Sequence, residues 1–464
     1  MTIDNYLRSQ DRFDALHKIL YEHASDWQTY LSYFEAPFNH LFVLRDWQGF
    51  LHIGIPGSAE FDRASIENKN QLRLAKDKLT DAAGVLLHPS NGYFFSDDLF
   101  DAQAFWASED KVLWDECSPV RVYWIERQVR EKIWTQKPTE EQGEHTLRIV
   151  FFGIKGGVGR SSALLASAYH LMSQGKTVLV LDADFESPGV SSTLLAEDLR
   201  PDYGLVDWFA LDSLQPNLTH ELIEKNRLVE RSGLERISKQ GGTVWVSPAY
   251  GQKTQDYVGK LGRLYQATSG KSYVERFTAL LCALECELKP DVVLIDSRAG
   301  VDDTSALALT QLNAHSLLFA THGRATWSAY ELLFSHWQHF AELKDNGEDF
   351  RGNLHVVSAL APSRTTYDKD FLDASYRLFQ EHLYEELAED ESEGERFNFG
   401  ADDPDAPHYP SLVRWDDILR NFDPIQNPAQ LEEATFRKAF GELTQLMDRL
   451  CEATDHSTEE HHEN

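Results

Sequence analysis

The sequence predicts an α/β fold in which a mostly parallel sheet is flanked by helices and follows a smaller α+β domain. From Leu147 onward, short apolar runs alternate with helical patterns, which is typical of a parallel sheet. Ahead of these runs, residues 136–145 are polar and contain proline and glycine, as domain boundaries often do. A chain of 464 residues also suits two domains better than one.

We therefore expect four parts: an N-terminal α+β domain (1–135), a linker (136–146), the main domain (147–452) and a disordered acidic tail (453–464). The N-terminal domain is rich in tryptophan but shows no catalytic pattern, so its role is unknown from the sequence. Apolar spacing predicts its elements, which are helices over 11–22 and 68–83, a strand, turn and strand over 41–55, and a third element over 120–134.

The main domain contains apolar runs of strand length, bounded by turn residues. An amphipathic helix from about residue 428 closes it. The expected strands are 148–153, 177–182, 243–247, 291–296, 316–321 and 354–360.

A glycine-rich turn joins the first of these strands to an apolar helix. Glycines let backbone N–H groups close around phosphate oxygens, and the helix adds its N-terminal dipole. The usual phosphate-binding pattern is G-x-x-x-x-G-K-[ST], and here an arginine replaces its lysine. Ser161 is placed to give its hydroxyl to Mg²⁺, and Ser162 to touch the α-phosphate. The predicted phosphate-binding residues are Gly153, Lys155, Gly156, Gly157, Val158, Gly159, Arg160, Ser161 and Ser162.

Two later strands end in acids. Asp182 and Asp184 straddle Ala183 at the end of one strand, and Asp296 ends another. We expect these two carboxylates, Asp182 and Asp184, to have different tasks. Carboxylates at the carboxyl edge of a parallel sheet suit a metal-assisted phosphate chemistry.

The early Lys155, the Gly-Gly-Val-Gly run, Arg160-Ser161 and the two acid-ended strands, in this order, resemble the deviant Walker A ATPases of the ParA/MinD family, within the SIMIBI class of P-loop NTPases. The resemblance covers roughly residues 147–450 and says nothing of residues 1–140. It implies a P-loop NTPase fold with ATP and Mg²⁺ as cofactors.

The resemblance also implies residue roles. Lys155 would cross a dimer interface to the nucleotide of the other subunit, so that ATP holds a homodimer together. Asp184 would orient the attacking water, which makes Asp184 and Lys155 the predicted catalytic residues. Ser161, Asp182 and Asp296 would form the magnesium shell.

Further contacts follow from the same resemblance. Gly300 would offer its N–H to the γ-phosphate, and residues 358–364 with Pro410 would approach the base. The asparagine that often reads adenine is missing, so the choice of ATP over GTP rests on the family.

Two departures from the family pattern concern arginines. Arg160 keeps a cation where relatives carry lysine, so we expect nucleotide binding to survive and the hydrolysis rate to be affected. Arg298 stands where relatives often carry proline, and either acts on phosphate or pairs with Asp302 or Asp303.

Composition limits the partners. The net charge is −31, from 44 basic and 75 acidic residues, which disfavours nucleic acid and anionic membranes. No apolar run is long enough to span a membrane, and the N-terminus lacks a signal-peptide layout. Four cysteines suit a reducing compartment, so we expect a cytoplasmic protein.

Three functions fit these observations. The first is a slow, partner-stimulated ATPase switch whose ATP-dependent dimerisation controls an unidentified protein partner, for example in a multi-gene bacterial system such as phage defence. The second is a non-hydrolysing nucleotide sensor or scaffold. The third is a DNA-partition ATPase, which the acidic charge disfavours.

Overall fold

The computed structural model describes residues 9–45, 50–84, 87–88, 90, 92–107, 111–113, 120–126, 134, 146–237, 241–264, 271–338, 350–385, 396–417 and 420–463. The chain divides into two compact units, Met1–Lys132 and Ile133–Asn464. The predicted linker lies almost entirely outside the described residues.

The N-terminal unit is built on a five-stranded mixed sheet of order β3-β2-β1-β5-β4. Alternate residues of β1 face opposite sides: Leu41 and Val43 pack with α2, α3 and α4, while Phe42 packs with Trp106 of α5. The predicted strand pair and both predicted helices are present. The elements are α2 (Ser9–Glu22), α3 (Ala24–Leu31), β1 (Leu41–Arg45), β2 (Leu51–Ile55), α4 (Ile66–Ala83), β3 (Tyr93–Phe95), α5 (Ala102–Trp106), β4 (Val112–Leu113) and β5 (Val122–Glu126).

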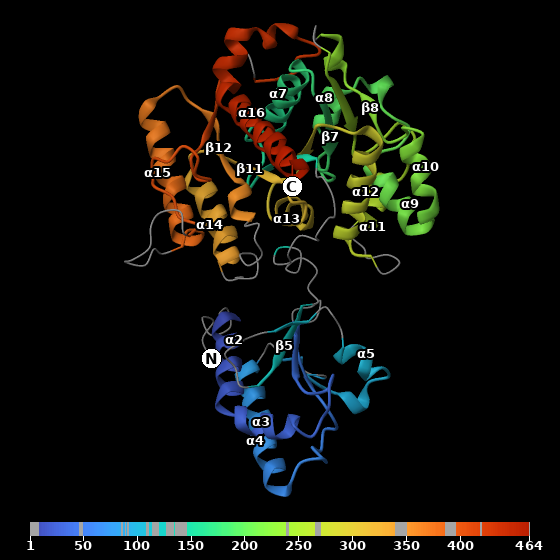
Figure 1. The fold of residues 1–464 in the computed structure, drawn as a ribbon, viewed down its shortest axis with the longest axis vertical. Helices are drawn as coiled ribbons and strands as arrows, with labels where there is room; N and C mark the ends of the chain where they lie inside the picture. Colours follow the sequence, from blue (N-terminus) through green and yellow to red (C-terminus); the bar gives the residue numbers. More distant parts are fainter. Residues whose placement is uncertain are drawn as a thin grey trace. The chain divides into compact units, whose positions relative to one another are not determined.

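The second unit contains an eight-stranded sheet of order β13-β12-β11-β6-β10-β7-β9-β8. Every neighbouring pair is parallel except β8 with β9. The predicted fold class is therefore confirmed (Figure 1). The strands are β6 (Leu147–Gly153), β7 (Thr177–Asp182), β8 (Glu230–Arg231), β9 (Thr243–Ser247), β10 (Val292–Asp296), β11 (His315–Ala320), β12 (Leu354–Ala361) and β13 (Ser411–Arg414).

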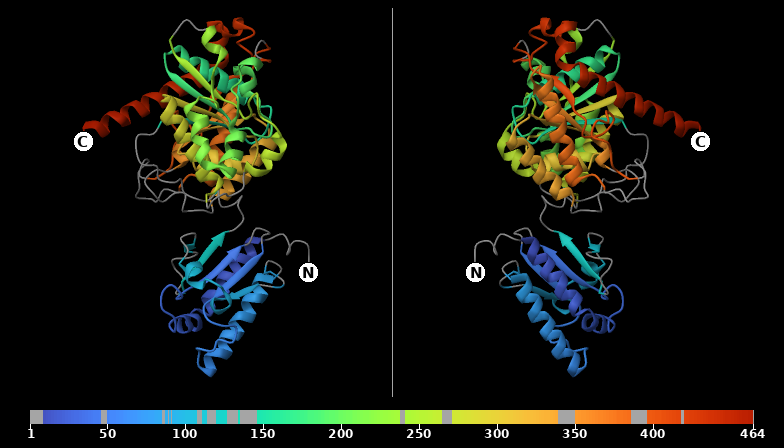
Figure 2. Two further views of the ribbon diagram at one scale, coloured as in Figure 1. Left: turned by 90° about the vertical axis from the view of Figure 1, so that its right-hand side faces the viewer. Right: turned by 90° about the vertical axis from the view of Figure 1, so that its left-hand side faces the viewer.

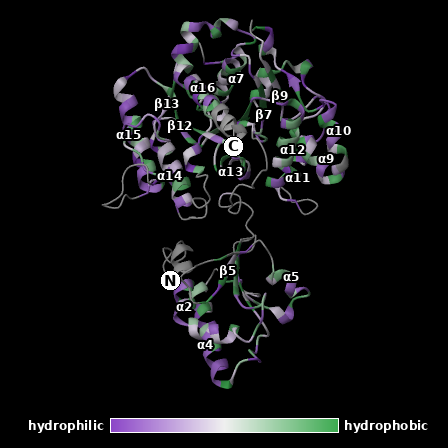
Figure 3. Cartoon of the chain, viewed as in Figure 1, coloured by the Kyte–Doolittle hydropathy of each residue, from purple (hydrophilic) through white to green (hydrophobic). Residues whose placement is uncertain are grey.

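Helices cover both faces of this sheet. Along β6, Ile149 and Phe151 face one helix layer, and Val150 and Phe152 face the other. Apolar residues gather along the strands and the inner helix faces, as Figure 3 shows. One layer holds α7 (Arg160–Ser173), α8 (Val190–Leu194) and α16 (Glu433–Glu463), and the other holds α9 (Leu205–Leu214), α10 (Thr219–Glu224), α11 (Tyr257–Leu264), α12 (Tyr273–Leu288), α13 (Asp303–Thr310), α14 (Arg324–Gln338) and α15 (Thr365–His382).

The C-terminal helix differs from the prediction. Where a disordered tail is expected from residue 453, α16 continues to Glu463 and extends away from the rest of its unit in both views of Figure 2. Its last ten residues contain neither glycine nor proline, so nothing in the sequence stops the helix. Among the described residues, no helix is long and apolar enough to cross a membrane.

Candidate functional site

The glycine-rich loop leaves β6 at Gly153 and enters α7 at Arg160. Gly157 and Gly159 adopt φ angles of 74° and 79°, which favour glycine, and Gly159 precedes the helix as its N-cap. A cavity of about 560 Å³ opens over this loop. It is lined by Lys155, Gly156, Gly157, Val158, Gly159, Arg160, Ser161, Ser162, Asp184, Glu186, Ser187, Arg298 and Ala299.

Neighbouring elements fix the loop in place. The hydroxyl of Tyr330, which is buried on α14, donates to Phe319 O at 2.9 Å and accepts from Ile154 N at 3.4 Å. A side chain added at Gly159 would come within 3.3 Å of Leu360, so β12 also packs closely here. Such contacts between distant elements leave no signal in the sequence.

The strand-end acids converge on Arg160. Its Nε donates to Asp296 Oδ1 at 2.7 Å and its Nη2 to Asp184 Oδ2 at 3.0 Å. Ser161 Oγ donates to the second oxygen of Asp296 at 3.2 Å. The arginine side chain is only 10% exposed, so both ion pairs are shielded from water.

Asp182 is buried beside Asp296. The two residues are register partners on β7 and β10, so their side chains share a face of the sheet. Asp182 Oδ2 accepts from Ser191 N and Oγ at 3.1 and 2.5 Å. Its Oδ1 has no hydrogen-bond partner among the described residues. Burial, and then the charge of Asp296, raises the pKa of Asp182 to about 7.

The oxygens of Ser161, Asp182 and Asp296 suit a hard cation such as Mg²⁺. Within the described ranges, no three acidic, histidine or cysteine residues gather closely enough to hold a metal alone. Mg²⁺ usually takes one or two carboxylates and completes its shell with water and phosphate oxygens.

Residues 183–189 form the turn between β7 and α8. Asp184 Oδ1 accepts from Ser187 N at 3.2 Å, while its other oxygen faces Arg160. Tyr257 on α11 donates its hydroxyl to Phe185 O at 2.6 Å. Burial raises the pKa of Asp184, and Arg160 opposes that rise. Glu186 and Tyr257 are site residues that the sequence does not indicate.

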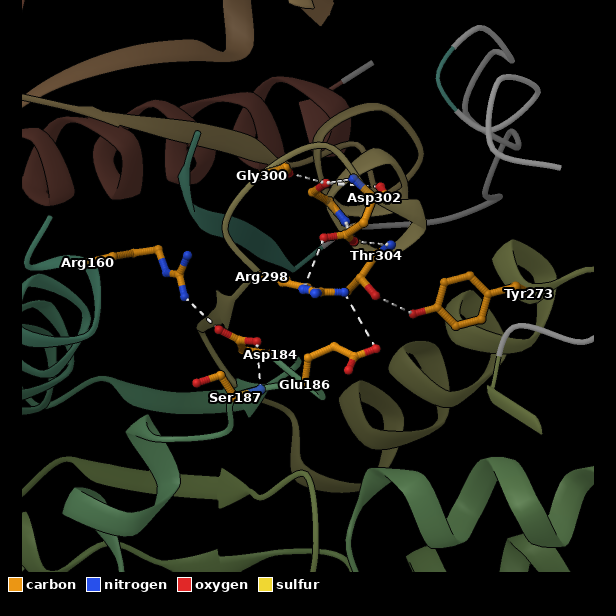
Figure 4. Close-up of polar contacts among 10 residues, drawn as sticks. Arg160, Asp184, Glu186, Ser187, Tyr273, Arg298, Gly300, Asp302 and Thr304 are labelled. Atoms are coloured by element: carbon orange, nitrogen blue, oxygen red, sulfur yellow. Dashed lines mark hydrogen bonds and ion pairs between the residues drawn. The ribbon is translucent and has the colours of Figure 1, made fainter. Parts of the chain in front are cut away.

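Gly300, a predicted phosphate contact, is placed otherwise, and Arg298 lies beside one of the two acids that the sequence offers it. The N–H of Gly300 donates to Gly153 O at 3.0 Å, so it holds the glycine-rich loop instead of facing the cavity. Arg298 lies between Glu186 and Asp302, at 3.5 and 3.6 Å, as Figure 4 shows. The sequence offers Asp302 as a partner of Arg298, and Glu186 is the addition.

The two segments of the predicted base pocket belong to the neighbouring strands β12 and β13 or adjoin them. Residues 358–364 end β12 near Gly159, but Pro410 comes just before β13. Ser411 pairs with Val357, well before the end of β12, so the register sets Pro410 back from the carboxyl edge of the sheet. Pro410 therefore comes just before the residue that pairs with Val357, and its predicted contact with the base stays a prediction.

Lys155 lies on the rim of the cavity. It is exposed, and within the described residues it makes no ion pair. Its predicted contact with a second subunit stays a prediction.

Comparison with solved structures finds similar folds at low identity. Cobyrinic acid a,c-diamide synthase from Mycobacterium smegmatis, solved with an ATP analogue and magnesium, is 18% identical over 50% of this chain and 83% of its own, with a TM-score of 0.36. The pNOB8 ParA bound to nonspecific DNA is 16% identical over 68% of this chain and 100% of its own, with a TM-score of 0.39. A ParA family ATPase from Chlorobium tepidum TLS is 15% identical over 67% and 100%, also with a TM-score of 0.39.

No protein-family model and no curated protein matches the chain. The chain is thus similar in structure to ParA family ATPases, and the case for nucleotide chemistry rests on its own loop and carboxylates.

Proposed function

We propose that the chain is an ATPase switch that binds ATP with Mg²⁺ over the glycine-rich loop, hydrolyses it slowly, and dimerises in the ATP-bound form to control a protein partner. The observation that carries the proposal is a cavity at the start of α7 that is lined by Arg160 and Asp184, with Arg160 paired both to Asp184 and to Asp296 at the end of β10. Phosphate groups are the ligands that this combination suits.

Arg160 supports phosphate binding. Its planar donors match phosphate oxygens, and the start of α7 adds the positive end of a helix dipole. Phosphate oxygens would replace the carboxylates of Asp184 and Asp296 as its acceptors. Nucleotide binding would thereby free the carboxylates of Asp184 and Asp296 from Arg160.

The metal would be held by Ser161, by Asp296 and by the Oδ1 of Asp182, which has no partner among the described residues. Bound there, Mg²⁺ would neutralise charge on the phosphates.

Asp184 is the residue that we propose orients the attacking water. It lines the cavity, and the backbone N–H of Ser187 fixes its orientation. Once Arg160 turns to phosphate, one carboxylate oxygen of Asp184 becomes available to accept from water. Positioning and charge neutralisation supply most of phosphoryl-transfer catalysis, so the protein need not provide a covalent catalytic group.

Dimerisation is supported by Lys155, an exposed residue of the cavity lining. The aromatic-rich N-terminal unit is the part that we propose contacts the protein partner. The net charge of −31 continues to disfavour nucleic acid and anionic membranes as partners.

A non-hydrolysing sensor is the second candidate. The observation that favours it is that Arg160 donates to two carboxylates, at 2.7 and 3.0 Å. An arginine bound in this way cannot also stabilise the charge that develops on phosphate during hydrolysis.

Phosphate release separates the two candidates. The ATPase predicts slow release that needs Mg²⁺ and is lost in the double variant Ser161→Ala, Asp296→Ala. Arg227→Ala, whose ion pair with Asp202 lies outside the cavity lining, should leave the rate unchanged. ATP binding without release would select the sensor, and neither binding nor release would exclude both.

A further inference from the structure

Arg298 is a second arginine of the cavity, and the proposed mechanism does not use it. It lies two residues after Asp296, in the loop between β10 and α13, and lines the cavity with Glu186 and Ala299. Its side chain is 38% exposed, against 10% for Arg160. The two arginines therefore differ in how accessible they are to a ligand.

The contacts of Arg298 are long. Its Nη1 is 3.5 Å from Glu186 Oε1 and its Nε is 3.6 Å from Asp302 Oδ2. Good N–H···O hydrogen bonds measure about 2.7–3.2 Å, so neither contact is one. Arg160 holds its carboxylates at 2.7 and 3.0 Å by comparison. Arg298 is thus attracted by two carboxylates without being fixed by either.

The two carboxylates are not equivalent. Asp302 is the N-cap of α13, and its Oδ1 accepts from Thr304 N and Ser305 N at 2.8 and 3.0 Å. Glu186 is 39% exposed and lies on the turn between β7 and α8. Figure 4 shows the guanidinium of Arg298 between these two elements. A phosphate can therefore replace Glu186 beside Arg298 with a smaller loss of existing contacts than it can replace Asp302.

The terminal phosphate of a nucleotide would arrive at this end of the cavity. In P-loop proteins the metal-binding serine and the strand-end acid lie beside the outer phosphates. Arg298 follows that acid, Asp296, along the chain. Glu186 would face the incoming negative charge, and Arg298 is the nearby cation that can offset it.

We propose that Arg298 determines specificity for a nucleoside triphosphate: it binds the terminal phosphate, and Glu186 competes with that phosphate for its guanidinium. The inference rests on the proposed nucleotide binding and deepens it. A diphosphate lacks the group that Arg298 would contact, so the contact contributes to triphosphate affinity alone.

Calorimetry with a non-hydrolysable ATP analogue and with ADP, each with Mg²⁺, tests the inference. We expect Arg298→Ala to weaken binding of the analogue at least about tenfold, because a charge-assisted hydrogen bond is lost. ADP affinity should change less than about twofold, since ADP makes no such bond. Arg298→Lys, which keeps the charge but not the fork, should fall between wild type and Arg298→Ala.

Glu186→Gln should act in the opposite direction. Removing the competing carboxylate should strengthen binding of the analogue about threefold, as expected for a partly exposed ion pair. In the Arg298→Ala background the same change should strengthen binding less, because the competition for Arg298 has gone and only the repulsion between Glu186 and phosphate is removed. Arg227→Ala is the matched control, with a side chain 36% exposed and an ion pair to Asp202 at 2.8 Å.

Two results would overturn the inference: equal losses for ADP and the analogue in Arg298→Ala, or unchanged or weaker analogue binding in Glu186→Gln. If Arg298→Ala does not fold, Glu186→Gln decides the matter. If the wild type binds neither ATP analogue nor ADP, the proposed function itself is refuted. This result differs from both results that would overturn the inference about Arg298.

Discussion

Arg160 organises the site at the scale of single residues. Its guanidinium reaches Asp184 after β7 and Asp296 at the end of β10. A forked, permanently charged group can donate to two acids at once, which a single ammonium does with less geometric control. The sequence places Arg160 in the glycine-rich loop but does not reveal these two pairs, because they join segments far apart in the chain.

The first residue-scale prediction concerns Asp184→Ala. We expect ATP to bind as well as in wild type or better, because Arg160 loses one carboxylate that competes with phosphate. Turnover should fall about a hundredfold, since water orientation acts mainly in the transition state. Phosphate release measures the rate, and turnover equal to wild type would refute the assigned role.

The second concerns Asp182, whose folded-state pKa of about 7 lies above the value of about 4 in an unfolded chain. Between these values the folded protein binds the proton more tightly, so the free energy of unfolding falls as pH rises through that window. Asp182→Asn removes this titration and keeps an acceptor for Ser191.

Chemical denaturation without nucleotide or Mg²⁺ measures the effect. Relative to wild type, Asp182→Asn should gain stability between about pH 5 and about pH 8, by about 1 kcal/mol or more. A stability difference that is the same at both pH values would show that Asp182 does not titrate in this range.

At the scale of elements, the turn between β7 and α8 depends on tertiary anchors. Ser191 ties the start of α8 back to Asp182, and Tyr257 on α11 holds the carbonyl of Phe185. Asp184 and Glu186 lie between these anchors. The orientation of both acids therefore depends on a helix more than seventy residues away.

We expect Tyr257→Phe to loosen this turn without unfolding the unit. Loss of one hydrogen bond costs about 1 kcal/mol, which should raise amide exchange rates across residues 183–191 about fivefold. Hydrogen exchange followed by mass spectrometry measures this. Tyr169→Phe on α7 is the control, and equal exchange in the two variants would show that the Tyr257 hydroxyl does not hold the turn.

The elements themselves were largely predictable. The six predicted strands appear with ends shifted by one residue at most, because buried parallel strands are continuous apolar runs. β8 and β13 were not predicted. The two residues of β8, Glu230–Arg231, are too few to show an alternating pattern. β13, Ser411–Arg414, follows an acidic, proline-containing segment that does not resemble the approach to a strand. The position of Pro410 could not be predicted for the same reason, since the register of an unrecognised strand decides where it lies.

At the scale of the whole molecule, the chain combines a compact aromatic-rich unit with an α/β unit that carries the cavity. We propose that ATP links two copies of the second unit through Lys155. Within the described residues this exposed lysine makes no ion pair, so its charge is available for an intermolecular contact.

Lys155→Ala tests that contact. We expect the variant to bind ATP but to dimerise about a hundredfold more weakly, because it loses a charge-assisted contact made only between subunits. Sedimentation of wild type, Asp184→Ala and Lys155→Ala, with and without ATP, measures the shift. Should Lys155→Ala dimerise with ATP as readily as wild type, the lysine is not an intersubunit ligand.

The central claim is that Mg²⁺ and ATP bind where the glycine-rich loop meets the carboxylates of β7 and β10. Calorimetry of a non-hydrolysable ATP analogue tests it most directly, in wild type and in the double variant Ser161→Ala, Asp296→Ala. We expect Mg²⁺-dependent binding in wild type and a loss of affinity of at least about a hundredfold in the variant, since two of the side chains that we propose bind the metal are removed. Equal affinity in the two proteins would contradict it.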